Sequence, residues 1–250
     1  MNITYESDIK PIIDYEKDAL AWNDAQLYNP ATRHRRRIIL NWLKPLQFKT
    51  VLEVGCGQGY LLDQICDCFS VQCTGTDIAK STILDNQKRN SRHHFAVLDI
   101  EKDILPNRFD LVIASEVIEH INDYQRAITN MTKMANRYIL ITVPCSKVFP
   151  IDKMVGHFRH YQPADLISEL EKNGFQTLKW AKWGFPFHTI YKHLINLGGS
   201  KKMHKTFTIK PYGLGQKLIA YLIYPLFFFN LNSLGYQLFV LAEKRGIENV

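Results

Sequence analysis

Three glycines at alternate positions follow a short apolar run in the stretch VLEVGCGQGY, residues 51–60. Such a loop lets the backbone approach a ligand, because a side chain there would collide with it or forbid the required dihedral angles. The spacing is GxGxG at Gly55, Gly57 and Gly59, with Tyr60 where a dinucleotide-binding GxGxxG needs its last glycine. No Gly-Lys-Ser/Thr follows, which excludes a phosphate-cradling P-loop. The ligand that remains is another kind of nucleoside.

Acidic residues stand at the ends of the strands predicted around this loop. Glu53 lies two residues before the first glycine, and Asp77 ends a strand 22 residues after Gly55. A carboxylate at the second position can accept hydrogen bonds from two ribose hydroxyls. Asp99 ends the third strand, where it can accept from an adenine amino group, and Glu116 follows the fourth. A series at successive strand ends favours a nucleoside site over solvated ends or helix caps.

The elements that must position these residues follow from the pattern of apolar runs. Between residues 50 and 144, short apolar runs alternate with helix-length segments, which indicates βαβ units and a parallel sheet covered on both faces. Ligands bind outside the carboxyl ends of such strands. The apolar spacing at 38–46 predicts an earlier helix with Thr32 as its N-cap. We expect the fourth strand to run into a helix at Ser115 and Glu116.

The sequence resembles the class I S-adenosylmethionine-dependent methyltransferases, of the ubiquinone-pathway O-methyltransferase-like, small-molecule type. The matching stretches are EVGCGQG, TDI, LDI and FDLVIASEVIEHI, in the order and spacing of that family, and the resemblance runs from about residue 33 to 175. It implies an α/β fold: a Rossmann-like, doubly wound, mostly parallel seven-stranded sheet with an antiparallel last strand and a helical C-terminal insertion. It also implies S-adenosyl-L-methionine as cofactor and S-adenosyl-L-homocysteine as product.

The resemblance also implies a role for each residue of the loop and the strand ends. Glu53 and the glycines would lie near the methionine part, Asp77 would hold the ribose, and Asp99 with Ile100 would border the adenine. Arg36, in the run RHRRR, is expected near the methionine carboxylate. The cofactor-binding residues predicted in this way are Glu53, Gly55, Cys56, Gly57, Gly59, Asp77, Ile78, Asp99, Ile100, Ser115 and Glu116.

Two histidines are the predicted catalytic residues, His157 first and His120 second. The segment DKMVGHFRHYQPADL resembles one that follows the fifth strand in small-molecule and lipid-pathway members, which brings His157 near the methyl group. Methyl transfer needs a positioned nucleophile and, for some acceptors, a base, and the ordinary histidine pKa of about 6.5 suits that base. A second reading stays open: His157, Arg159 and Tyr161 only hold the loop.

The pentapeptide EVIEH places Glu116, Glu119 and His120 where they could hold a divalent metal. Many relatives without a metal carry the same letters, so a structural helix start is favoured and no metal is predicted. Two alternative functions are kept: a metal-dependent RNA 2′-O-methyltransferase that uses these three residues, and a non-catalytic binding module.

The sequence predicts four parts: an N-terminal helical segment (1–50), a cofactor-binding core (51–185), a helical lid or insertion (186–235), and a last strand with a tail (236–250). From Lys172 to Ala242 there are nine lysines and no acidic residue. The apolar block LIAYLIYPLFFFNL, 218–231, is too short to span a bilayer. We expect a small-molecule or lipid-like acceptor. A peripheral membrane contact through 186–235 and a homodimer contact stay open, and nucleic acid is not expected because the lysine-rich segment has no arginine.

The five cysteines are an odd number without disulfide-framework spacing, so we expect free thiols in a reducing compartment. The first residues are polar and acidic, without the apolar stretch of a secretory signal. These features favour a cytoplasmic protein that is also able to work peripherally at a membrane.

Overall fold

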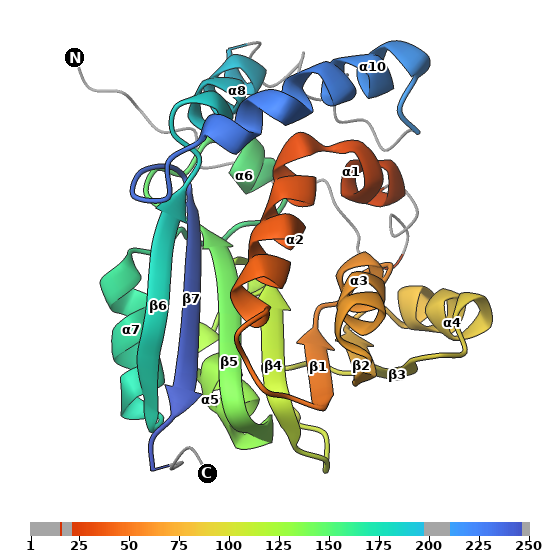
Figure 1. The fold of residues 1–250 in the computed structure, drawn as a ribbon, viewed down its shortest axis with the longest axis vertical. Coiled ribbons are helices and arrows are strands. Elements are labelled where there is room, and N and C mark those ends of the chain that lie inside the picture. The colour runs from red at the N-terminus through yellow and green to blue at the C-terminus, as the bar shows by residue number, and fades with distance from the viewer. Residues whose placement is uncertain (1–15, 17–21, 198–210, 247–250) are drawn as a thin grey trace.

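A computed structural model describes Glu16, residues 22–197 and residues 211–246. Most of the first 21 residues, residues 198–210 within the predicted lid or insertion, and the last four residues lie outside the described residues. The centre of the fold is one seven-stranded sheet in the order β3-β2-β1-β4-β5-β7-β6 (Figure 1). Its strands are β1 (Thr50–Val54), β2 (Gln72–Asp77), β3 (His94–Val97), β4 (Phe109–Ser115), β5 (Ala135–Pro144), β6 (Phe175–Trp183) and β7 (Gln237–Lys244).

The strand directions confirm the predicted fold class. Strands β1 to β5 pair in parallel, and β7 lies antiparallel between β5 and β6. The order reverses beside β1, which is paired with β2 on one side and β4 on the other. In a sheet of this kind the crevice at the reversal is where a ligand binds.

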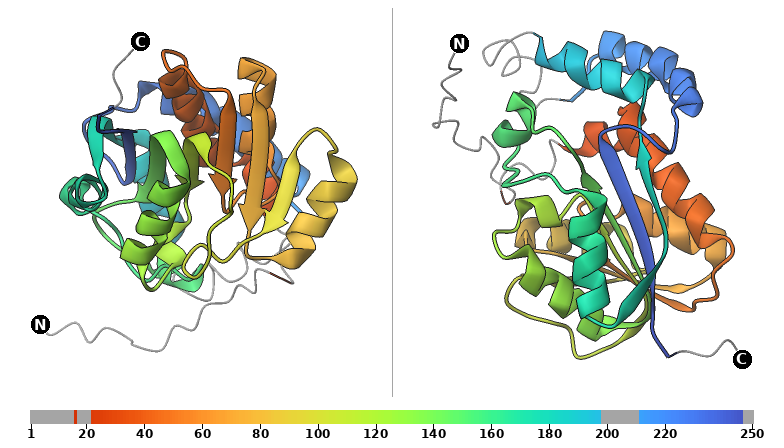
Figure 2. Two further views of the ribbon diagram at one scale, coloured as in Figure 1. Left: turned by 90° about the horizontal axis from the view of Figure 1, so that it is seen from below. Right: turned by 90° about the vertical axis from the view of Figure 1, so that its left-hand side faces the viewer.

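Helices cover both faces of this sheet (Figure 2). They are α1 (Trp22–Tyr28), α2 (Pro30–Leu43), α3 (Tyr60–Phe69), α4 (Lys80–Arg89), α5 (Tyr124–Met134), α6 (Pro150–Met154), α7 (Pro163–Lys172), α8 (Phe187–Asn196) and α10 (Leu214–Ile223), with the 3-10 helices η2 (Ile118–His120) and η3 (Tyr224–Phe229).

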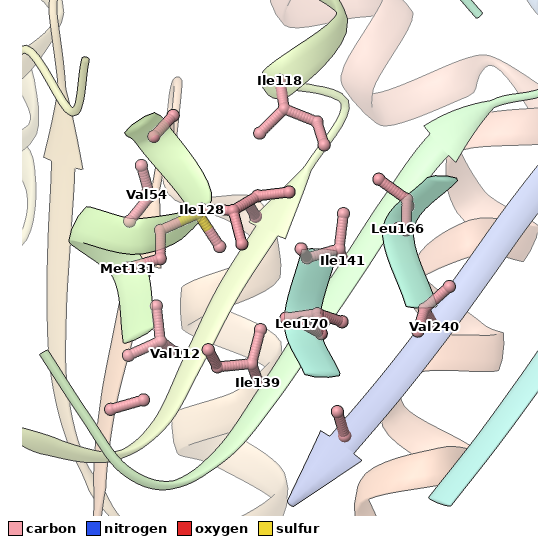
Figure 3. Packing of buried hydrophobic residues seen from close by; sticks show 14 of the residues in the cluster. Val54, Val112, Ile118, Ile128, Met131, Ile139, Ile141, Leu166, Leu170 and Val240 are labelled. Atoms are coloured by element: carbon pink, nitrogen blue, oxygen red, sulfur yellow. The ribbon is translucent and has the colours of Figure 1, made fainter. Parts of the chain in front are cut away.

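Alternation along the strands builds two hydrophobic layers. Leu52 and Val54 join a cluster with α5 and α7, part of which is shown in Figure 3, whereas Val51 of the same strand joins a cluster with α2 and α3. Full burial of each such side chain stabilises the fold by roughly 1.5–3 kcal/mol. The sheet is thereby a rigid support for the loops at its carboxyl edge.

Two local predictions were wrong. Helix α2 is capped by Asn29 and not by Thr32: the Asn29 side chain accepts from the N–H of Ala31 at 2.8 Å, and Pro30 occupies the first helical position. After β4 no helix starts at Ser115 and Glu116, because Glu116 adopts a positive φ of 61° that ends regular structure. A single 3-10 turn follows there, and α5 begins only after its cap, Asp123.

The expectation of free thiols was wrong for two of the five cysteines. Cys66, near the end of α3, forms a disulfide with Cys73 in β2, where the Cα atoms lie 6.5 Å apart. The tight connection from helix to strand brings them together. Cys56, Cys68 and Cys145 are free thiols.

Candidate active site

The glycine-rich loop joins β1 to α3 at the carboxyl edge of the sheet. Gly55, Gly57 and Gly59 all have positive φ values, of 66°, 50° and 78°, which favour glycine. A Cβ on Gly55 would lie 2.4 Å from a methyl carbon of Val117, so the neighbouring loop excludes a side chain there. A Cβ on Gly57 would meet nothing within 4 Å. The backbone at Gly57 therefore faces open space, as the cradle of a ligand must.

Asp77 holds this loop in shape from the end of β2. One carboxylate oxygen accepts from the N–H of Gly57 at 2.9 Å, and the other accepts from the N–H of Ala79 at 2.9 Å. Burial raises the pKa of Asp77, and these N–H groups oppose the rise. A carboxylate offers about four acceptor positions, so Asp77 can accept further hydrogen bonds from a ligand.

A pocket opens between the glycine loop and helices α1 and α2. Five of the predicted cofactor residues line it: Glu53, Gly55, Cys56, Gly57 and Ser115. Arg36 lines it too, together with residues that the sequence did not predict to bind the cofactor: Gln26, Thr32, Arg35, Gln58, Tyr60 and Leu61. The predicted residues Gly59, Asp77, Ile78, Asp99, Ile100 and Glu116 lie outside this lining.

The predicted adenine-side residues lie in different surroundings. Asp99 accepts from the Lys102 ammonium at 2.6 Å. The Ile78 side chain is exposed, whereas that of Ile100 is buried in the core cluster. Only the backbone of Ile100 is left to border a ligand.

Glu53 and Arg36 give the pocket its charge. Glu53 is buried, and its Oε2 has no hydrogen-bond partner. Burial raises the pKa of Glu53 to about 8, although Arg36 opposes the rise. Arg36 donates from Nη1 to the Gln26 carbonyl at 2.8 Å, but its buried Nε has no partner. Unsatisfied buried polar atoms are costly, so a ligand with an ammonium and a carboxylate, such as the methionine part of the implied cofactor, fits both atoms.

Glu116 does not join Glu119 and His120 in the metal-binding group that the sequence had offered. It forms an ion pair with Arg35 at 3.2 Å and accepts from the Gln237 side-chain amide at 2.6 Å. These contacts tie the end of β4 to α2 and β7. Glu119, His120 and His157 instead bring their ligand atoms within 4.8 Å of one another.

We name His120, His157, His160, Glu119 and Asp152 the histidine cluster. The rings of His120 and His157 meet edge to face at 4.6 Å. Nδ1 of His157 lies 3.2 Å from Nε2 of His160, which in turn lies 3.3 Å from Asp152. The cluster joins η2 to the segment 152–160, so it contains both predicted catalytic histidines.

Burial controls protonation in the histidine cluster. It lowers the pKa of His120 to about 4, and that of His157 to about 2 with the help of the neighbouring His120 and His160. It raises the pKa of Glu119, whose two carboxylate oxygens lack hydrogen-bond partners. At neutral pH the imidazoles are therefore uncharged, but the lowered pKa makes each of them a weaker base than an ordinary histidine.

The loop-holding role is divided among the neighbours of His157. Tyr161 donates from its buried hydroxyl to the Ile118 carbonyl at 2.9 Å, and Arg159 donates to the Asn122 carbonyl at 2.9 Å. These two bonds anchor the segment to η2 and the turn after it. They leave His157 to face His120.

Comparison with known proteins places this geometry in a family. The curated relatives include the malonyl-[acyl-carrier protein] O-methyltransferase of Bacillus cytotoxicus, 34% identical over 97 residues, which cover 36% of this chain and 33% of that protein. The ubiquinone biosynthesis O-methyltransferase of Coxiella burnetii is 30% identical over 119 residues, 41% of this chain and 49% of that protein. The chain thus spans a third to a half of the length of these relatives.

A solved structure and a family model extend the match. The N-methyltransferase NodS of Bradyrhizobium japonicum, in complex with S-adenosyl-L-homocysteine, has a TM-score of 0.59 at 18% identity and covers 92% of this chain and 96% of its own. At that identity it shows the fold alone. The model of the methyltransferase domain family matches residues 26–179, more than half of the chain. The chain belongs to the methyltransferase domain family.

Proposed function

We propose that the protein transfers the methyl group of S-adenosyl-L-methionine to an oxygen or nitrogen of a small or lipid-like acceptor. The relatives named above are a malonyl-[acyl-carrier protein] O-methyltransferase and a ubiquinone biosynthesis O-methyltransferase, which supports an oxygen acceptor. The position of the histidines is compatible with the same choice, because a hydroxyl must lose a proton when it is methylated and His157 offers an unprotonated ring nitrogen, although its lowered pKa makes it a weak base.

One observation carries the proposal: a buried carboxylate without a partner on Oε2, Glu53, faces a pocket floored by left-handed glycine backbone. Burial keeps Glu53 largely protonated at neutral pH, and the ammonium group of a methionine would favour its ionised form, whereas a phosphate would not. The same pocket holds the unpartnered Nε of Arg36, which suits the carboxylate of a methionine.

The cofactor supplies a methyl carbon already activated by positive sulfur, so the residues of the chain have two tasks. Glu53, Arg36 and the glycine loop bind and orient the methyl donor. Asp77 fixes the loop and accepts from the ribose. His157, next to His120, accepts the proton of the acceptor hydroxyl at an unprotonated ring nitrogen. Positioning of this kind supplies much of the rate acceleration in transfer reactions.

Calorimetry with the purified full chain tests the proposal. S-adenosyl-L-methionine and S-adenosyl-L-homocysteine should bind, whereas NADH and ATP should not. A coupled assay for S-adenosyl-L-homocysteine, run on panels of phenols, carboxylic acids and amines, then seeks the acceptor. Binding of NADH or ATP instead would sink the proposal, and binding without turnover on any acceptor would favour the non-catalytic module.

A metal-dependent transfer is the second candidate, because Glu119, His120 and His157 converge. Glu119 and the two uncharged imidazoles fit a transition metal, for which imidazole is a suitable ligand. Such an ion would polarise the acceptor hydroxyl. Its ligands would not include Glu116, which the sequence had grouped with Glu119 and His120. Elemental analysis of the protein, and turnover before and after dialysis against a chelator, separate this candidate from the first.

A further inference from the structure

The outer surface of α10 and η3 is unusually apolar. Leu214 is 89% exposed, Leu222 is 65% exposed and Phe229 is 71% exposed. We name the outer apolar face the set of exposed side chains on these two elements: Leu214, Leu218, Ile219, Leu222, Leu226, Phe228 and Phe229. Single exposed leucines are ordinary on a protein surface, but a continuous helical stripe of them marks an interaction site.

The opposite side of the same two elements is already packed on the protein. Ala220 is buried, and so is Phe227, whose ring lies 5.9 Å from that of Trp183. Leu214, Leu218 and Leu222 are spaced by four residues and therefore lie along one side of the helix. A helix that is apolar on both sides needs cover on both. Among the described residues, only the inner side of these two elements is covered.

Charge decides what supplies the outer cover. The sequence from Lys172 to Ala242 holds nine lysines and no acidic residue, and of the described ones only Lys217 lies on α10, where it pairs with Asp24 at 3.6 Å. Two further cations, Arg33 and Arg37 of α2, lie over the rings of Tyr224 and Phe228 at 3.8 and 4.5 Å. A second copy of this chain would bring the same positive segment to the contact, and like charges across an interface are unfavourable. An anionic lipid surface offers the opposite charge to the lysines and an apolar layer to the leucines.

We propose that the outer apolar face docks on the surface of an anionic lipid bilayer. The described residues contain no helix that could cross one. An interfacial helix needs only to insert its apolar side by about 5–10 Å, which leaves the sheet outside the membrane. Docking does not depend on the proposed methyl transfer, so either can fail while the other holds.

The position of this face gives docking a use. Helices α8 and α10 lie side by side at the end of the molecule to which β1 and β4 point (Figure 1). Helix α8 contacts the histidine cluster through Lys192, which pairs with Asp152 at 3.1 Å. A protein held by α10 would therefore present that end of the sheet, and the cluster with it, to the lipid surface.

Co-sedimentation of the full chain with vesicles tests the inference without any methyl donor. We expect binding to vesicles that contain phosphatidylglycerol, much weaker binding to pure phosphatidylcholine, and loss of binding in high salt. The double variant Leu218→Glu, Leu222→Glu should bind more than tenfold more weakly, because two leucines no longer enter the bilayer and two negative charges are added. The matched control is the double variant Leu84→Glu, Leu178→Glu, which adds the same two charges at leucines on α4 and β6 that are 44% and 47% exposed.

Each other outcome counts against the inference. Equal sedimentation of the double variant and the control would show that the outer apolar face takes no part. The wild-type chain could fail to bind anionic vesicles while light scattering shows a dimer that the double variant does not form. In that case a second copy of the chain covers the outer apolar face. Calorimetry with S-adenosyl-L-homocysteine and circular dichroism check that the variants are folded, so a folding defect is not read as lost docking.

Discussion

The pocket for the methyl donor and the histidine cluster lie at the same edge of the sheet but are built differently. Five of the twelve residues that line the pocket come from one short loop and the strand before it, with Glu53, Gly55 and Gly57 inside five residues, and the others come from α1, α2, α3 and β4. The histidine cluster is drawn from η2 and from the segment 152–160, with Lys192 of α8 added by an ion pair. A local motif can define the first site, whereas only the fold can assemble the second.

The two regions also hold their charges in opposite ways. In the pocket, burial raises the pKa of Glu53 to about 8. In the histidine cluster, burial lowers the pKa of His157 to about 2. Glu53 and His157 are thus both largely uncharged at neutral pH, for the same reason of burial. The comparison predicts that variants in one region spare the function of the other.

The largest effect is expected at His157. In His157→Gln, kcat should fall by roughly 10²–10⁴-fold, the contribution usual for a general base. The dissociation constant for S-adenosyl-L-methionine should stay the same, because the pocket does not include this residue. Steady-state kinetics with a hydroxyl acceptor and calorimetry measure the two quantities. An equal loss of cofactor affinity would show that His157 acts only by holding the loop.

Asp77→Ala should abolish detectable cofactor binding, with at least about a hundredfold loss of affinity. Each hydrogen bond to a charged group is worth about 1.5–3 kcal/mol, and the variant also releases the N–H of Gly57. Calorimetry measures the affinity, and circular dichroism checks the fold. Unchanged affinity would mean that the ribose is held elsewhere.

Lowering the pH should reduce the stability that the histidine cluster contributes to the folded protein. A histidine whose pKa is lowered in the folded protein contributes stability above its ordinary pKa, and this contribution is lost as the pH falls below about 6.5. Between pH 7 and pH 5 the wild-type free energy of unfolding should fall further than that of His157→Gln, by up to about 2 kcal/mol for this one group. Urea unfolding at the two pH values measures the difference. Parallel losses in both proteins would show that His157 is not buried in its uncharged form.

The smallest effect is expected at Glu53, and part of it is a change in the free energy of unfolding at high pH. Its pKa is raised, so its contribution to stability is full below its ordinary pKa and is lost as the pH rises through about 8. Glu53→Gln should therefore unfold less readily than the wild type at pH 9 while binding the cofactor about tenfold more weakly, the loss of one charge-assisted hydrogen bond. Denaturation at pH 6 and pH 9 checks the first part.

A second readout isolates the same residue. If the cofactor ammonium binds ionised Glu53, binding at pH 7 must release a proton. Calorimetry in buffers of different ionisation enthalpy should detect this release in the wild type and miss it in Glu53→Gln. Binding without proton release in the wild type would place the ammonium elsewhere.

The sequence predicted the sheet, the glycine loop and the strand-end acids because each depends on a local pattern. Alternating apolar runs define strands, and positive φ values demand glycine within a few residues. The same local logic failed where two patterns competed. Thr32 and Asn29 are both good caps, and Pro30 decided in favour of Asn29 because proline suits the first helical position.

The remaining features depend on contacts between distant segments. Nothing in the letters around Gln26 shows that its carbonyl accepts from Arg36, or that Glu116 turns away from Glu119 to pair with Arg35. The positive φ of Glu116 causes that turn and has no sequence signature in a non-glycine residue. The sequence showed that residues 218–231 are apolar, but only the exposed fractions of their side chains showed which side of α10 and η3 forms the outer apolar face.

Helix α1 has a consequence for the pace of the reaction. Its Gln26 lines the pocket and binds Arg36, and its Asn23 accepts from Tyr60 beside the glycine loop. A helix of seven residues has little stability of its own in water. We therefore expect α1 to detach from the pocket readily, and these side-chain bonds to be what holds it there. We expect departure of the spent cofactor, and not the displacement at carbon, to limit each cycle. Weakening these bonds should then lower the affinity for the cofactor and raise the turnover rate.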